Sequence, residues 1–133
     1  MEWDFARLLK IALWVTAPVN ILGGAVAAAS PSTILEVAFG VLAPDPVLLG
    51  VTRIFYAFVV VLGVGFIVAA RDPARQSALV LVGGLAKLAA VCGWIALYLQ
   101  GNGTPNVLAA CAFDAPLGLL FVFAFVRLHS SRA

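Results

Sequence analysis

Four polar side chains interrupt long apolar stretches of the sequence: Asn20, Arg53, Lys87 and Asp114. A charge at the centre of a bilayer costs a few kcal/mol or more, so such residues are rare there and are the first candidates for function. Arg and Lys offer charged donors, Asp offers an acceptor that can exchange a proton, and Asn offers both donor and acceptor. Tyr56 follows Arg53 by three residues, which predicts that its hydroxyl lies on the same helix face.

Composition indicates that the elements carrying these residues are membrane-spanning helices. Of the 133 residues, 64% are hydrophobic and 11% are charged, and the mean hydropathy is +1.12, whereas a soluble domain carries about 25% charged residues. A transmembrane helix needs about 20 mainly apolar residues. Four segments qualify: 8–29, 46–70, 73–99 and 105–127. We therefore predict an all-α polytopic membrane protein in which residues 1–133 form a single four-helix transmembrane bundle.

The last three spans begin with a capping residue followed by proline. An Asp or Thr oxygen at the N-cap accepts a hydrogen bond from a free backbone N–H, and proline suits the first helical position because it has no N–H to satisfy. The three pairs are Asp45-Pro46, Asp72-Pro73 and Thr104-Pro105. They predict helix starts at residues 46, 73 and 105.

The segment 30–44 between the first two spans is apolar but too short to cross the membrane. Thr33 followed three residues later by Glu36 fits a capping box. We predict a short extracytoplasmic helix over 33–42 that lies on the membrane surface or folds over the bundle as a lid, with Glu36 as its charged residue.

The Lys and Arg residues near the ends of the spans all fall on one side of the membrane. They are Arg7, Lys10, Arg71, Arg75, Arg127 and Arg132. Because basic loops stay in the cytoplasm, this asymmetry predicts a multi-pass protein of the cell (inner) membrane with both termini cytoplasmic.

The helix rise places all four polar residues in the outer half of the membrane. Arg53 lies about 10 Å below the outer end of its span, Asn20 and Asp114 about 13 Å, and Lys87 about 18 Å. Each belongs to a different span, so the four could converge inside the bundle. One interpretation is structural: Asp114 pairs with a base and Asn20 bonds between helices, which holds the bundle together. The other is a polar ligand-binding pocket open to the outside and formed by Asn20, Arg53, Tyr56, Lys87 and Asp114.

In that pocket two cations face one anion, which leaves one positive charge in excess. Glu36 from the lid, or an anionic or hydrogen-bonding ligand, could satisfy it. No metal or cofactor is predicted, because Cys92, Cys111 and His129 are scattered and form no metal-binding spacing. The few basic residues also exclude a nucleic-acid-binding face. The partners that the sequence allows are the lipid bilayer, a small-molecule or lipid ligand, and a second copy in a homodimer.

The run Gly83-Gly84-Leu85-Ala86-Lys87-Leu88 resembles the glycine-then-lysine pattern in a helix of DoxX-like proteins, a family of small bacterial membrane proteins built from four helices. In that family the pattern tends to occur in the first span, whereas here it lies in the third. The resemblance implies a four-helix architecture rather than a particular activity.

We expect a non-enzymatic protein that binds a small or amphipathic molecule in the outward-facing pocket. A small proton-coupled transporter subunit, with Asp114 as the proton carrier, is one alternative. A membrane enzyme acting on a lipid or sterol-like substrate is another, with Asp114 as acid or base and Lys87 or Arg53 as electrophile.

Overall fold

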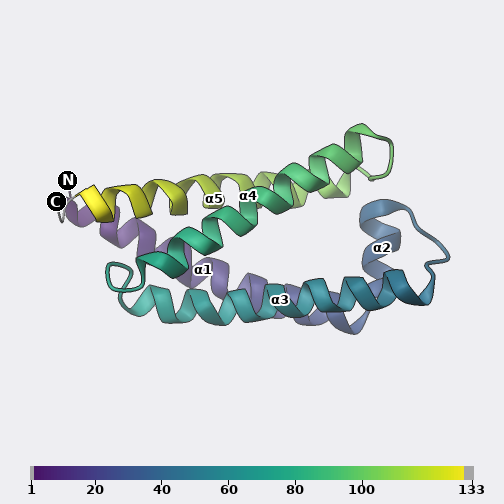
Figure 1. Ribbon diagram of the computed structural model, residues 1–133, viewed down its shortest axis with the longest axis horizontal. Coiled ribbons are helices and arrows are strands. Elements are labelled where there is room, and N and C mark those ends of the chain that lie inside the picture. The colour runs from purple at the N-terminus through teal and green to yellow at the C-terminus, as the bar shows by residue number, and fades with distance from the viewer. Residues whose placement is uncertain (1, 131–133) are drawn as a thin grey trace.

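The computed structural model describes residues 2–130, and every regular element in that range is a helix. The helices are α1 (Glu2–Ala29), α2 (Pro31–Phe39), α3 (Pro46–Arg71), α4 (Ser77–Leu99) and α5 (Asn106–Ser130), shown in Figure 1. In the described part of the chain, four of them, α1, α3, α4 and α5, are long and apolar enough to cross a membrane. The predicted four-helix membrane bundle is confirmed. Arg132, counted above among the basic residues, lies outside the described range.

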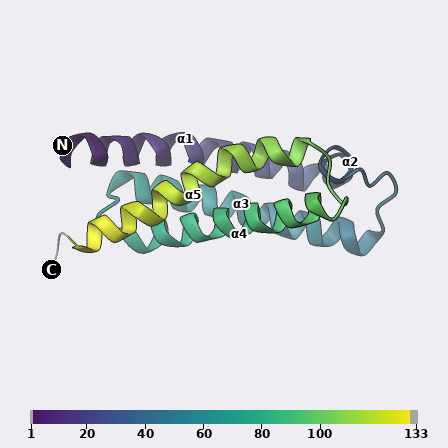
Figure 2. The same cartoon turned by 90° about the horizontal axis from the view of Figure 1, so that it is seen from above.

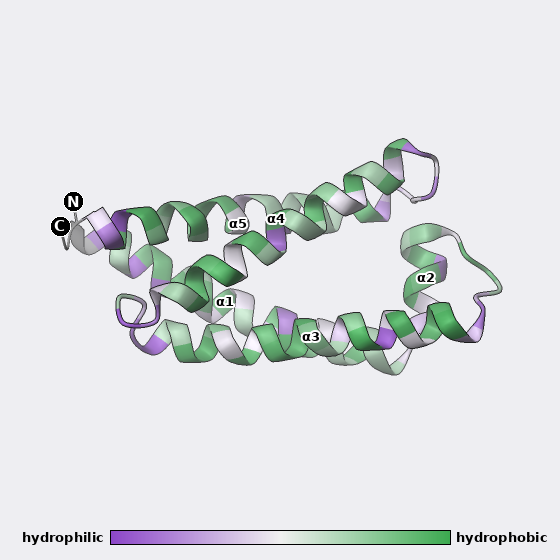
Figure 3. Cartoon of the chain, in the orientation of Figure 1, coloured by the Kyte–Doolittle hydropathy of each residue, from purple (hydrophilic) through white to green (hydrophobic). Residues whose placement is uncertain are grey.

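The four long helices form two pairs. Helix α1 packs along α3, and α4 packs along α5. The pairs converge at the end where α1 begins and α5 ends, called here the termini end, and they diverge toward the opposite end, called the α2 end (Figures 1 and 2). Hydrophobic residues cover most of the length of the helices (Figure 3), as a surface in contact with lipid requires.

Close packing within each pair depends on glycine. A Cβ atom on Gly63 of α3 would lie 3.0 Å from the carbonyl oxygen of Ala17 of α1. A Cβ atom on Gly84 of α4 would likewise lie 3.0 Å from the carbonyl oxygen of Gly118 of α5. Small residues let transmembrane backbones approach closely, and van der Waals packing then drives association because lipid is as apolar as the helices.

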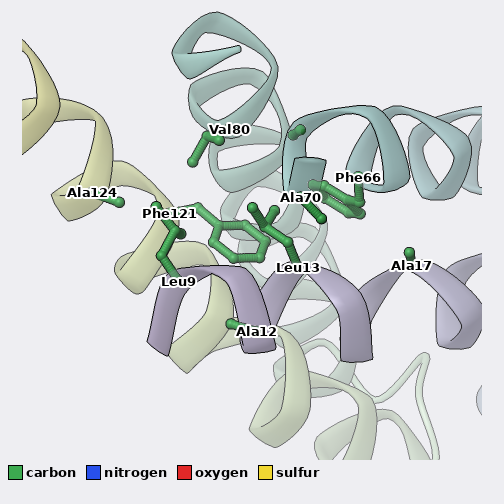
Figure 4. Close-up of a cluster of buried hydrophobic side chains, with 10 residues drawn as sticks. Leu9, Ala12, Leu13, Ala17, Phe66, Ala70, Val80, Phe121 and Ala124 are labelled. Carbon is green, nitrogen blue, oxygen red and sulfur yellow. The ribbon is translucent and has the colours of Figure 1, made fainter. Parts of the chain in front are cut away.

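The main core lies near the termini end, where the two pairs meet (Figure 4). Leu13, Phe66, Val80 and Phe121, one from each long helix, are completely buried. The rings of Phe66 and Phe121 lie 5.3 Å apart between centroids. The Phe66 ring also fills the space that a side chain at Gly83 would need. A glycine in α4 and an aromatic residue in α3 therefore fix the point at which the pairs cross.

The capping predictions hold for α3 but not for α4. Asp45 caps α3 as predicted, since its Oδ1 accepts hydrogen bonds from the backbone N–H groups of Val47 (2.8 Å) and Leu48 (2.9 Å). Asp72 instead ends α3, and its Oδ1 accepts from the N–H of Arg75 at 3.1 Å within a turn over residues 73–76. The predicted start of the third span at residue 73 is thus wrong, because these residues form the turn and α4 begins at Ser77.

Helix α5 begins at Asn106, immediately after Pro105, and the Oγ1 of Thr104 accepts from the Asn106 N–H at 3.3 Å. The predicted role of Thr104 is therefore confirmed. The helix starts one residue later than predicted, because Pro105 belongs to the turn that precedes it.

A short helix between the first two long ones is confirmed as α2, but its bounds differ from the prediction. It starts at Pro31 after Ser30, and no side chain caps it, so the capping box of Thr33 and Glu36 is wrong. Proline at the first position suffices to start the helix earlier. Gly40 ends it with φ of 70°, a conformation that glycine adopts without strain.

Candidate functional site

Lys87 of α4 forms an ion pair with Asp114 of α5 in the middle of the bundle. The Lys87 side chain is only 4% exposed, whereas that of Asp114 is 17% exposed. The Lys87 ammonium also donates to Oδ1 of Asn20 on α1 at 3.4 Å, and it lies 5.6 Å from the centroid of the Phe113 ring. A carboxylate, an amide oxygen and an aromatic face thus surround the cation. The contact with Asn20 joins the α4–α5 pair to α1.

The local sequence allows this meeting of helices. Gly83 and Gly84 lie one turn before Lys87 and bring α4 close to α3 and α5. Pro18 in α1 and Pro116 in α5 each lie two residues from a member of the cluster. Proline has no N–H, so each of these helices lacks one backbone hydrogen bond close to its polar side chain.

A cavity of about 580 Å³ adjoins this cluster between the two pairs. Its polar lining consists of Asn20, Tyr56, Lys87 and Asp114, to which Trp94 adds an indole. Apolar side chains, mainly from α3 and α4, make up the remainder. Phe58, Val61 and Val64 line it while being 69%, 66% and 51% exposed. The cavity therefore opens at a surface in the middle of a membrane-spanning helix, where the surrounding solvent is hydrocarbon.

A second cavity of about 410 Å³ lies beneath α2, whose Leu35 and Phe39 contribute to its lining. It shares Phe55, Tyr56 and Trp94 with the first cavity. The two cavities therefore adjoin one another at these three aromatic side chains.

Helix α2 bridges the two pairs at their divergent end. It follows α1 in the chain, yet its last carbonyl groups bond to the start of α5. The Ala38 oxygen accepts from the Thr104 N–H at 2.8 Å, and the Val37 oxygen accepts from Thr104 Oγ1 (2.6 Å) and Asn106 Nδ2 (3.1 Å). The last carbonyl groups of a helix have no partner within it, so residues of another segment cap α2 and fix its position.

The structure brings Asn20, Lys87 and Asp114 together and places Tyr56 in the same cavity, but it does not bring Arg53 to them. Arg53 is exposed, lines neither cavity, and makes no hydrogen bond or ion pair with any residue in the range 2–130. Thr52 and Tyr56, four residues apart, form the inward face of α3 at this level. Arg53 lies about 100° around the helix from Thr52 and faces outward.

Glu36 is also exposed and contacts no member of the cluster. It lies on the outer side of α2, whereas Leu35 and Phe39 face the second cavity. The predicted excess of positive charge is therefore wrong for the cavity: Lys87 and Asp114 balance one another, and Arg53 is elsewhere.

Cys92 is exposed, Cys111 is buried, and both are free thiols, so the two cysteines do not pair. Among the described residues no group of three or more His, Cys, Asp or Glu side chains is placed to hold a metal ion. Sequence reasoning missed Thr104 and Asn106 as anchors of α2. Their hydrogen-bonding side chains at a predicted helix start were the available signal.

Fold and site together define a four-helix integral membrane protein with a cavity between two helix pairs. Comparison of the chain with protein-family models, with curated proteins and with solved structures gave no match. The resemblance to DoxX-like proteins stays a prediction.

Proposed function

We propose that the protein binds an amphipathic molecule that enters the first cavity sideways from the bilayer. The observation that carries this proposal is the cavity itself, which is open to hydrocarbon along α3 and bounded by the buried Lys87–Asp114 pair and Asn20. Its volume of about 580 Å³ falls within the range of about 300–1,000 Å³ that is usual for small-molecule sites. An apolar chain fits the α3 and α4 lining, and a polar end group fits the cluster.

The proposed orientation puts the termini end in the cytoplasm, because Arg7, Arg71, Arg75 and Arg127 all belong to that end of the bundle. The polar cluster and both cavities then face toward the outer leaflet. The proton-coupled transporter and the lipid-modifying enzyme stay predictions that no observation here favours.

Tryptophan fluorescence offers a direct test, because Trp94 lines both cavities and the chain has only three tryptophans. A variant with Trp3→Phe and Trp14→Phe retains Trp94 alone. Its fluorescence is measured in lipid nanodiscs while a brominated long-chain alcohol or fatty acid, which quenches tryptophan on contact, is added. Binding in the cavity predicts quenching that saturates. A matched variant that retains only Trp14, which is 50% exposed on α1, reports on the surrounding lipid and should show no saturation.

Two glycines provide a matched pair of cavity-filling controls. Gly65 lines the cavity and Gly23 does not, and at both positions an added Cβ atom meets nothing within 4 Å. Gly65→Leu should therefore abolish the saturable quenching of Trp94, whereas Gly23→Leu should leave it intact. Quenching without saturation in the Trp94 protein, or equal effects of the two leucines, would refute the proposal.

A further inference from the structure

Besides Trp94, whose indole N–H also has no partner among the described residues, three side chains of the first cavity each keep a hydrogen-bonding atom without a protein partner. They are Nδ2 of Asn20, the hydroxyl of Tyr56 and Oδ2 of Asp114, none of which bonds to any residue that the structure describes. Within that same part of the chain, no buried side-chain nitrogen or oxygen lacks a partner. The three atoms are therefore accessible rather than sealed in the protein, and their residues line the cavity.

The cation of the cluster is, by contrast, already engaged. Lys87 is 4% exposed, donates to Asp114 and to Asn20, and directs its remaining side toward the ring of Phe113. An anionic end group would find no free cation here and would meet the Asp114 carboxylate. A cationic end group would lie beside the Lys87 ammonium. Charge therefore disfavours both kinds of ion and favours a neutral group.

The free atoms also specify which neutral group fits. The Asp114 oxygen can only accept, the Asn20 amide nitrogen can only donate, and the Tyr56 hydroxyl can do either. A group that satisfies the Asp and Asn atoms together must be both a donor and an acceptor. A hydroxyl is the smallest such group, whereas an ether or ester oxygen accepts only and would leave the Asp114 carboxylate unpaired.

We propose that the cavity is selective for neutral long-chain alcohols, whose hydroxyl donates to Asp114 and accepts from Asn20 or Tyr56. This inference rests on the proposed function, because it names the end group of the amphipathic ligand. A hydrogen bond to a charged group contributes about 1.5–3 kcal/mol, so loss of the hydroxyl should weaken binding by about 10- to 100-fold.

The test uses the Trp94-only protein and three probes that carry bromine at the same chain position: a primary long-chain alcohol, its methyl ether and the corresponding fatty acid. Titrations are run at a pH at which the acid is ionised. We expect the alcohol to reach half-saturation at a concentration about 10- to 100-fold below that of the ether and the acid. Tyr56→Phe removes a single hydroxyl without touching the ion pair. Because an alcohol and an ether can both accept from Tyr56, whereas only the alcohol donates to Asp114, the preference for alcohol over ether should persist in this variant.

The outcomes separate the two claims. Equal half-saturation by all three probes would overturn the alcohol selectivity and leave the proposed function standing, as would tightest binding of the acid. Loss of the alcohol preference in Tyr56→Phe would overturn the assignment of Asp114 as the acceptor that selects the alcohol. Absence of saturable quenching with every probe would overturn the proposed function and this inference together.

Discussion

Replacement of Asp114 by alanine should destabilise the protein more than any other single change in the polar cluster. The substitution leaves Lys87, which is 4% exposed, with only the Asn20 oxygen at 3.4 Å as a hydrogen-bond acceptor. Removal of one member of a buried ion pair typically costs about 3–5 kcal/mol, because the remaining charge is stranded away from water. We expect a loss of about 3 kcal/mol or more in the free energy of unfolding.

The opposite substitution, Lys87→Met, should cost less. Asp114 is 17% exposed and borders the open cavity, so its carboxylate is less completely desolvated than the ammonium would be. The methionine also replaces most of the lysine's apolar stem. A loss of about 1–3 kcal/mol is expected, from the unpaired acceptor. Arg53→Met should change stability by no more than about 0.5 kcal/mol, because Arg53 has no partner among residues 2–130.

The double variant Asp114→Ala with Lys87→Met isolates the pair. Once both charges are gone no ion is stranded, so the double variant should be more stable than Asp114→Ala alone. The free energies can be measured by reversible unfolding in mixed micelles of a mild detergent and dodecyl sulfate, with helicity as the readout. Wild-type stability in Asp114→Ala, or strictly additive losses in the double variant, would refute the assignment of a buried, coupled pair.

Two further predictions test the packing and the topology. Gly83→Ala should lower the free energy of unfolding by about 1–3 kcal/mol in the same assay, since its methyl group would overlap the Phe66 ring. Gly65→Ala is the control. Its methyl group meets nothing within 4 Å, so the variant should be as stable as the wild type or slightly more stable. In a cysteine-free background, a membrane-impermeant thiol reagent applied from outside should label Asn102→Cys and spare Arg75→Cys, and the reverse pattern would invert the proposed orientation.

The number and approximate positions of the long helices could be predicted from the sequence because the bilayer sets the length and polarity of a span, although α1 begins at Glu2 rather than near residue 8. The start of α3 was also predictable, since Asp45 acts only on the residues that follow it. Asp72-Pro73 has the same local pattern but a different outcome. Asp72 ends the preceding helix and shapes a turn, so its role depends on where α3 stops, and the pair alone does not encode this.

The sequence predicted how far along each helix the site residues lie, but not which face of the helix carries them. The helix rise placed Asn20, Lys87 and Asp114 at similar levels, and their side chains meet in the bundle. Arg53 lies at a similar level, yet it faces outward because the packing of α3 against α1 turns Thr52 and Tyr56 inward. Which helices pair, and therefore which face of each is internal, follows from contacts far apart in the sequence. An almost uniformly apolar helix carries no periodic signal for that choice.

The bilayer also decides which part of a ligand can provide affinity. An alkyl chain that moves from lipid into an apolar cavity gains almost nothing from the hydrophobic effect, because lipid is as apolar as the lining. The chain must also displace lipid that would otherwise occupy the opening along α3. Net affinity must therefore come from hydrogen bonds that lipid chains cannot make. In the first cavity the groups beside the ion pair that offer such bonds are Asn20, Tyr56 and Asp114, with Lys87 holding the carboxylate in place. The ion pair thus has two effects. It ties α4 to α5, and it keeps the charged Asp114 carboxylate in an apolar environment. In such an environment a ligand hydroxyl would gain more from a hydrogen bond to that carboxylate than an alkyl chain gains from the apolar lining.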